Sequence, residues 1–314
     1  MRTPRIGLAL GGGGARGLAH IGMLEAFDEL GVKPAVIAGT SIGAIYGAAY
    51  ASGISGRELR DHTRFILSQR FGLIRDLFLA TAQPLQRLRN VFGPRDAILN
   101  SATVLDVILP KQVKDDFAEC AIPLKVVASD FYDQEPRVFT TGPLRTAVAA
   151  SMALPALFQP IVVNGRALID GGLTNPLPFD LLMTEADIIV AIDVSGVPVP
   201  NSRRAVPTAF EALFASAFLF ERTIIREKLK SAQPDILISA GTSRYQVLDF
   251  LKFDEILEAA APAKEKLKQQ LARVLSVETL PELSIAESEI LRVEAPKRKR
   301  RSLLSRSRRG PKQD

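Results

Sequence analysis

The stretch LALGGGGARGLAHIGML, Leu8–Leu24, carries the first signal of the fold. The apolar run RIGLAL at 5–10 has the character of a buried strand, and behind the glycines apolar residues recur with helical spacing as far as Gly31. The loop between them contains the spacing G-x-G-x-x-G at 12–17, which dinucleotide-binding proteins use at a strand-to-helix turn. The sequence therefore predicts a strand, a glycine turn and a helix, and leaves open whether the turn holds a phosphate.

The same order of elements repeats along the chain. PAVIAG at 34–39 leads directly into a small-residue helical pattern at 40–52, which favours a parallel sheet with crossover helices. Residues 186–194 are almost continuously apolar, as expected of a central parallel strand that is buried on both faces. Further strand-like runs lie at 123–130, 137–141, 160–165, 166–172 and 235–239, and helical patterns at 56–118, 209–229 and 253–274. The chain is therefore predicted to be an α/β protein.

Charge is unevenly distributed along the 314 residues, of which 47% are hydrophobic, enough for a sizeable core. Of the 40 basic and 34 acidic residues, 297–314 hold nine and one, which leaves 31 basic and 33 acidic residues in the rest of the chain. We expect a folded domain at 5–275 with a helical insertion at about 56–118. A weakly structured extension at 276–314, ending in a disordered basic tail, is expected to follow it.

Cysteine usage and hydropathy indicate a compartment. The single cysteine, Cys120, cannot form an internal disulfide, which favours a reducing environment. The apolar run near the N-terminus stops at Gly11, too short for a signal peptide, and no uninterrupted apolar stretch of about 18 residues follows. These features predict a cytoplasmic protein whose basic tail can make peripheral contact with an anionic membrane surface. Polybasic tails bind phosphates without discrimination, so no specific nucleic acid is expected.

GTSIG at 39–43 has the G-x-S-x-G spacing of a nucleophile elbow. A strand-like run precedes it and a small-residue helix follows, which is the context that this motif requires. Gly39 and Gly43 permit a tight turn that presents the hydroxyl of Ser41 at the helix N-terminus, where the helix dipole favours negative charge. The sequence therefore predicts Ser41 as a nucleophile, with an ordinary turn as the alternative.

A nucleophilic serine needs a base, and the histidines of this chain do not form an ordinary triad. In α/β-hydrolases the histidine comes last, whereas here His20 precedes Ser41, His62 lies only 21 residues after it, and no histidine follows. The remaining candidates for the base are a lysine or a carboxylate, and among the carboxylates Asp170 stands out, in LIDGGLTNPLP at the end of an apolar run. To act as a base it needs a pKa raised by burial, or a tight hydrogen bond to Ser41. An Asp-Gly turn that closes a hairpin is the competing interpretation.

Three motifs in this order, GGGARG at 12–17, GTSIG at 39–43 and DGG at 170–172, resemble those of the patatin-like phospholipase family. The resemblance continues in GLAHIGML behind the glycine loop, in ASDFYDQEPRVFTTG at 128–142, in ASMALPALFQP at 150–160 and in DGGLTNPLP at 170–178. It covers roughly residues 5–275 and is similar to the short bacterial members. It implies a three-layer α/β/α fold with a mainly parallel central sheet and a nucleophile elbow.

The resemblance also implies an activity. It implies a serine acyl hydrolase that cleaves lipid carboxylic esters, in phospholipids or lysophospholipids, through a Ser41–Asp170 dyad and an acyl-enzyme intermediate. Neither a metal nor another cofactor is expected. The backbone amides of Gly12, Gly13 and Gly14 would form the oxyanion hole. Supporting positions of the motifs are held by Arg16, Gly17, Gly39, Gly43, Gly171 and Gly172.

Two other functions compete with this one. A dinucleotide site needs an acidic residue at the end of the second strand, but that strand ends in AGTS at 38–41, and the chain has no G-K-[ST] for a P-loop. The alternative that stays open is a regulatory or interaction module on the same fold, with slow catalysis. Reactivity toward a serine-directed probe separates it from an active hydrolase.

Several further residues stand outside the three motifs or have more than one interpretation. Arg16 belongs to the motif or is a solvated surface arginine, and Ser151 and Pro155 line the acyl site or cap a helix. His20 is expected to be packed in the core, and His62 to lie on the surface. An interfacial surface, an acyl channel or ordinary core packing would each explain Phe210, Phe214, Phe218 and Phe220.

Overall fold

The computed structural model describes residues 4–69, 99–197, 206 and 209–279. The chain divides into two compact units, Met1–Leu275 and Ser276–Asp314. Of the second unit only residues 276–279 are described, as helix. The predicted helical insertion lies partly outside the described residues, because its middle part, 70–98, is not among them, and the basic tail lies outside them entirely.

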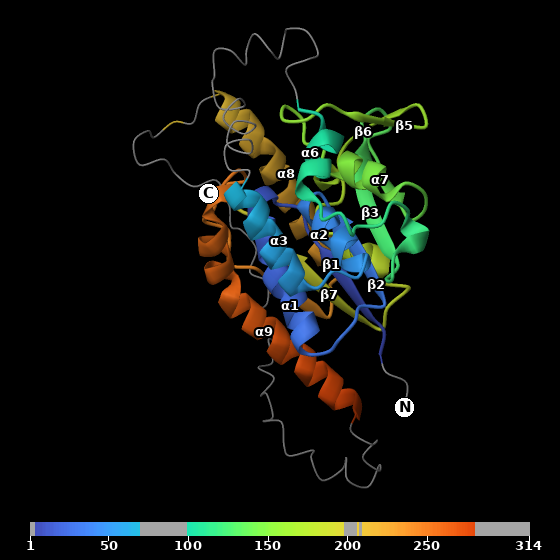
Figure 1. The fold of residues 1–314 in the computed structure, drawn as a ribbon, viewed down its shortest axis with the longest axis vertical. Helices are drawn as coiled ribbons and strands as arrows, with labels where there is room; N and C mark the ends of the chain where they lie inside the picture. The colour runs from blue at the N-terminus through green and yellow to red at the C-terminus, as the bar shows by residue number, and fades with distance from the viewer. Residues whose placement is uncertain (1–3, 70–98, 198–205, 207–208, 280–314) are drawn as a thin grey trace, which may run out of the picture. The chain divides into compact units, whose positions relative to one another are not determined.

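An eight-stranded sheet forms the centre of the described part of the first unit (Figure 1). Its strands are β1 (Ile6–Leu10), β2 (Val36–Thr40), β3 (Leu124–Asp130), β4 (Pro136–Phe139), β5 (Ile161–Val163), β6 (Arg166–Asp170), β7 (Ile188–Asp193) and β8 (Ile236–Ser239). Their order is β5-β6-β3-β2-β1-β7-β8, with β4 paired to β3. Pairs among β3, β2, β1, β7 and β8 are parallel, whereas β4, β5 and β6 pair antiparallel. The prediction of a mainly parallel sheet is confirmed.

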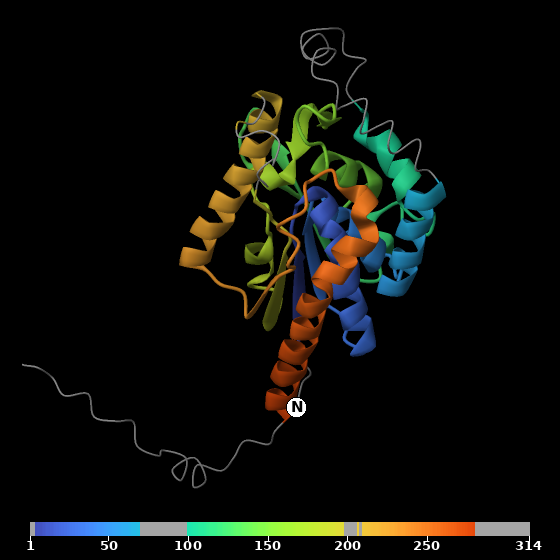
Figure 2. The same ribbon diagram turned by 90° about the vertical axis from the view of Figure 1, so that its left-hand side faces the viewer.

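Helices cover both faces of the sheet and make three layers (Figure 2). The longer helices are α1 (His20–Glu29), α2 (Ile42–Ala51), α3 (Gly56–Gln69), α6 (Ser101–Ile108), α7 (Leu144–Ser151), α8 (Ala209–Ser231) and α9 (Phe253–Thr279). Short 3-10 turns are η1 (Gly14–Ala19), η3 (Phe117–Glu119), η4 (Gly171–Leu173), η5 (Phe179–Leu182) and η6 (Phe250–Lys252). Helix α7 is not among the helices predicted from the sequence. No described helix has the length and hydropathy that crossing a membrane requires.

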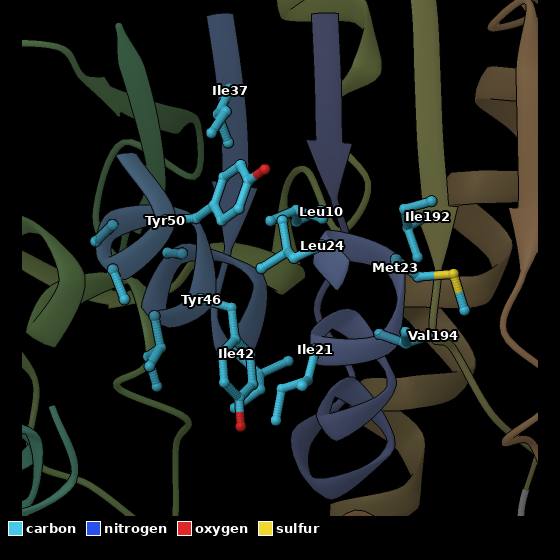
Figure 3. Packing of buried hydrophobic residues seen from close by; sticks show 14 of the residues in the cluster. Leu10, Ile21, Met23, Leu24, Ile37, Ile42, Tyr46, Tyr50, Ile192 and Val194 are labelled. Carbon is cyan, nitrogen blue, oxygen red and sulfur yellow. The ribbon is translucent and has the colours of Figure 1, made fainter. Parts of the chain in front are cut away.

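Alternation along the central strands explains the two packed faces. In β1, Leu8 and Leu10 belong to the large buried cluster that α1, α2 and α9 complete, whereas Ala9 between them faces the smaller cluster of η5 and α8. Successive side chains of a strand point to opposite faces, and both faces are covered, so the strands are apolar at nearly every position. Figure 3 shows Ile21 and Leu24 of α1 beside Ile42 and Tyr46 of α2 in the larger cluster.

The strand register brings the three sequence motifs to one edge of the sheet. Leu10 pairs with Gly39 in the parallel β1–β2 ladder, so the glycine loop and the serine turn leave the sheet at the same level. Thr40 pairs with Val127 of β3, and Ala128 of β3 pairs with Asp170. Because β6 runs antiparallel to β3, it enters the sheet from this edge and ends level with the serine turn.

Candidate active site

Ser41 occupies a tight turn between β2 and α2. Its φ is 55°, in the left-handed region that a residue with a side chain adopts only at a cost of about 1–3 kcal/mol. The turn depends on Gly43, where a Cβ would lie 2.1 Å from the carbonyl oxygen of Leu10. The chain can therefore turn directly from strand to helix, with Ser41 as the residue before the first helical position, as a nucleophile elbow requires.

The side chains of Ser41 and Asp170 meet across 129 residues of sequence. Ser41 Oγ donates a hydrogen bond of 2.6 Å to Asp170 Oδ2, and the amide of Gly172 donates one of 2.7 Å to Asp170 Oδ1. Asp170 is 2% exposed, and this burial raises the pKa of its carboxyl to about 6, although both hydrogen bonds oppose the shift. Asp170 thus combines the two properties expected of a base, a raised pKa and contact with the serine hydroxyl.

The residues behind Asp170 do not close a hairpin. They form the 3-10 turn η4, whereas the nearby hairpin between β5 and β6 turns at Asn164 and Gly165. A Cβ at Gly171 would lie 2.1 Å from the carbonyl oxygen of Val127, so η4 packs directly on the backbone of β3. The competing interpretation of DGG as a hairpin turn is wrong. The strands that pair with β6 are β5 and β3, which both precede it in the chain, and the chain continues after Asp170 into η4.

The glycine loop differs from the prediction at Gly12. Its amide donates a 2.9 Å hydrogen bond to the carbonyl oxygen of Pro176, so this group is not free to bind an oxyanion. In the described part of the chain, the amides of Gly13 and Gly14 have no hydrogen-bond acceptor, and both residues line the cavity that contains Ser41. Two of the three predicted donors therefore have the availability that an oxyanion hole requires.

Arg16 is buried, so its interpretation as a solvated surface residue is wrong. It is 3% exposed, its guanidinium carbon lies 5.0 Å from the ring centre of Phe218, and Gly196 lies against the guanidinium group. Its Nε and Nη2 have no hydrogen-bond partner within the described residues. Arg16 therefore packs the glycine loop against α8, on the face of the sheet opposite α1.

The other supporting glycines allow close backbone contacts. A Cβ would come within 2.6 Å of a neighbouring atom at Gly17, which faces Ile42, and at Gly39, which faces the oxygen of Gly43. At Gly172 it would lie 2.5 Å from Oε1 of Glu221. These residues serve the site through packing of the elements that carry Ser41 and Asp170.

Ser151, the last residue of α7, is hydrogen-bonded to the serine turn. Its hydroxyl donates a 2.5 Å hydrogen bond to the oxygen of Val127 and accepts one of 2.8 Å from the amide of Ser41. Neither Ser151 nor the exposed Pro155 lines the cavity, so the acyl-site interpretation of these two residues is wrong. The contact between Ser151 and Ser41 spans 110 residues, and no local pattern could have revealed it.

The two histidines have different surroundings. His20 is fully buried, its Nε2 lies 2.9 Å from the oxygen of Gly11, and burial lowers the pKa of its imidazole to about 4. It packs in the core as predicted. His62 was predicted at the surface, but it is half-buried, lies 3.0 Å through Nε2 from the oxygen of Ile108, and lines the cavity.

Ser41 and Asp170 line an apolar cavity. Its walls come from α2, α3, α6, the segment after α7, and α8, with Ile45, Leu59, Ile66, Val104, Leu157 and Phe218 among the lining side chains. Phe218 is buried and Phe220 is exposed, whereas the side chains of Phe210 and Phe214 lie outside the described residues. The described residues hold no cluster of three or more His, Cys, Asp or Glu side chains that could bind a metal ion. The geometry fits a long apolar group whose reactive end lies at Ser41.

Comparisons with known proteins found a family model that matches the chain and several similar proteins. The sequence model of the family described as patatin-like phospholipase matches residues 8–183. An uncharacterized NTE family protein of Mycobacterium tuberculosis is 33% identical over 206 residues, which cover 65% of this chain and 53% of that protein. Patatin-like phospholipase domain-containing protein 7 of Rattus norvegicus is 32% identical over 60% of this chain and 13% of its own length. A lysophospholipase of Neosartorya fischeri is 27% identical over 93% of this chain and 20% of its own length. The chain thus spans about half the length of the mycobacterial relative and less of the other two.

Proposed function

Because the chain belongs to the patatin-like phospholipase family, we propose that it is a lipid acyl hydrolase that cleaves carboxylic esters of phospholipids or lysophospholipids. The observation that carries the proposal is the 2.6 Å hydrogen bond between Ser41 and Asp170 at the polar end of an apolar cavity. Similarity to a lysophospholipase favours a substrate with one acyl chain. The cavity takes the acyl chain, and the ester lies at Ser41.

Acylation uses the serine and the carboxylate in one step. Ser41 Oγ attacks the ester carbonyl carbon while its proton passes to Asp170 Oδ2, and the carbonyl oxygen becomes an oxyanion that the amides of Gly13 and Gly14 bind. The bond between that carbon and the alcohol oxygen then breaks. The alcohol oxygen gains one proton as it leaves and Asp170 gives up the one that it received, so the site gains no net proton, and the acyl group stays on Ser41.

Deacylation repeats the chemistry with water. Asp170, again a carboxylate, takes a proton from a water molecule as the water oxygen attacks the acyl carbon. The bond to Ser41 Oγ breaks, the fatty acid leaves, and the proton on Asp170 returns to the serine oxygen. A base with a pKa of about 6 suits both directions of transfer near neutral pH.

The proposal is tested by labelling and turnover of the same set of proteins. Wild type, Ser41→Ala, Asp170→Asn and the surface control Ser216→Ala are treated with a fluorophosphonate probe and assayed on a medium-chain nitrophenyl ester. Wild type and the control should label and turn over, and both site variants should lose at least about 100-fold in kcat/KM. Turnover by Ser41→Ala would contradict the mechanism. An inert wild type would favour a regulatory or interaction module instead.

A further inference from the structure

A second buried carboxyl group lines the cavity beside the proposed dyad. Glu221 lies on α8, it is 3% exposed, and it borders the same cavity as Ser41 and Asp170. The cavity therefore receives one acidic side chain from strand β6 of the sheet and one from helix α8. The mechanism above gives Glu221 no task.

Gly172 shows how close the two carboxyl groups lie. A Cβ at this glycine would be 2.5 Å from Glu221 Oε1 and 3.1 Å from Asp170 Oδ1. Glu221 Oε1 and Asp170 Oδ1 therefore lie on either side of, or next to, the same position. The distance between the two oxygens cannot exceed these two distances taken together. Two carboxylates this close, both buried, cannot readily be ionised together, so one of them holds a proton.

The surrounding charges decide which carboxyl holds it. Asp170 accepts hydrogen bonds from Ser41 and Gly172, which favour its charged form, whereas no hydrogen bond to the Glu221 carboxyl is found within the described residues. The groups that face Glu221 are Asp170 of β6, Asp193 of β7 and Arg16 of η1, and Arg16 alone favours ionisation. Burial, and then Asp170, raise the pKa of Glu221 to about 8. At neutral pH Glu221 is therefore the protonated member and Asp170 the charged one.

The departing alcohol of an acyl transfer needs a proton. An alkoxide is a poor leaving group when the pKa of its alcohol is near that of water. Nitrophenolate leaves without protonation, because nitrophenol is much more acidic. We propose that Glu221 is the general acid of the reaction, which donates its carboxyl proton to the ester alcohol oxygen as the carbon–oxygen bond breaks. This inference rests on the proposed function, because it assigns a further residue of the same site.

Every proton is accounted for in both acylation and deacylation. Ser41 gives its proton to Asp170, and Glu221 gives its own to the alcohol, so the acyl-enzyme holds a protonated Asp170 and an ionised Glu221. Transfer of the proton from Asp170 to Glu221 then restores the base for deacylation. Water next gives one proton to Asp170, which passes it to Ser41, and the site returns to its first state.

The test compares two esters of the same acyl chain, a nitrophenyl ester and a glycerol monoester, on wild type and Glu221→Gln. The variant keeps the shape of the side chain but cannot donate an acidic proton. We expect kcat/KM for the glycerol ester to fall on the order of 100-fold, and that for the nitrophenyl ester by less than about threefold. In wild type the glycerol ester activity should also decline above about pH 8, and this decline should be absent from the nitrophenyl assay.

Controls separate this inference from the function itself. Glu227→Gln, at an exposed position of the same helix, should change neither ester. Equal losses on both esters, or no loss on either, would overturn the role of Glu221 as general acid, since the first result means a structural role and the second no role. If wild type hydrolyses neither ester, or Ser41→Ala hydrolyses both, the proposed function itself fails.

Discussion

Ser41 and Asp170 are each held in a state that opposes folding. Ser41 has a positive φ without being glycine, and Asp170 is a carboxylate at a fully buried position. The surrounding elements impose both states, because the ladder of β6 on β3 and the turn at Gly43 leave these two residues no alternative. Features of this kind concentrate at functional sites, and they make two predictions at the scale of single residues.

The first concerns the pH dependence of activity. Asp170 accepts a proton only while it is ionised, and its pKa is about 6. The value of kcat/KM for a nitrophenyl ester should therefore be constant above about pH 7 and fall tenfold per pH unit well below pH 6. A pH profile of wild type measures this directly. Full activity at pH 4.5 would mean that Asp170 is not the base.

The second concerns the stability of the site variant. The pKa of Asp170 rises from 3.8 in the unfolded chain to about 6 in the folded protein, so the folded state loses stability as pH rises through this interval. Asp170→Asn removes this penalty and should raise the free energy of unfolding by about 1–3 kcal/mol at pH 7. Urea unfolding at pH 7 and at pH 4 checks it, and the gain should vanish at pH 4. The control is the exposed Asp61→Asn, which should stay within about 0.5 kcal/mol of wild type at pH 7. A loss of stability in Asp170→Asn at pH 7 would contradict this prediction.

At the scale of elements, α7 connects the sheet to the serine turn through Ser151. The Ser151→Ala variant leaves the oxygen of Val127 and the amide of Ser41 without this partner in a buried place. We expect a loss of about 1–3 kcal/mol in the free energy of unfolding, with kcat reduced because the turn can shift. Urea unfolding and ester hydrolysis measure the two effects.

The control for Ser151 is Ser216→Ala, whose hydroxyl donates only to Ala212 within α8. Its stability should stay within about 0.5 kcal/mol of wild type. If Ser151→Ala matched the control in both stability and kcat, α7 would have no role in positioning Ser41.

At the scale of the whole described unit, ion pairs fasten α9 to the helices next to it. Lys264 of α9 lies 3.0 Å from Glu25 and 2.6 Å from Glu29 of α1, and Arg60 of α3 pairs with the same Glu25. Glu25 is buried, so its charge depends on these partners more than an exposed carboxylate would. Figure 2 shows α9 (orange) beside α1 (blue), the helix that carries Glu25 and Glu29.

This network predicts a difference between two lysines. Lys264→Met removes a half-buried cation between two carboxylates and should lower the free energy of unfolding by about 1–2 kcal/mol. Lys230→Met removes a lysine that is 66% exposed and pairs only within α8, so it should change stability by less than about 0.5 kcal/mol. Denaturant unfolding of both variants tests the comparison. Equal effects would mean that the network adds no more than a surface pair.

Much of the fold could be predicted because the signals are local. Apolar runs located all eight described strands, and the G-x-S-x-G and DGG motifs located the two residues whose side chains the structure joins. Helix α7 was missed because its sequence, LRTAVAAS, is short and follows a strand pattern without a strong boundary signal. The contact of the basic tail with an anionic surface stays a prediction, since residues 297–314 lie outside the described part of the chain.

The strands in chain order, the serine turn and Asp170 as a candidate base could be predicted from the amino-acid sequence, because hydrophobic period and glycine spacing act over a few residues. The folded structure was needed to show that the Gly12 amide is occupied, that Arg16 is buried, and that Ser151 and Glu221 reach the site. Each of these depends on which strands become neighbours and in which register. Contacts between residues far apart in the chain leave no periodic pattern in the sequence, so the roles of these residues follow only from the pairing of the strands.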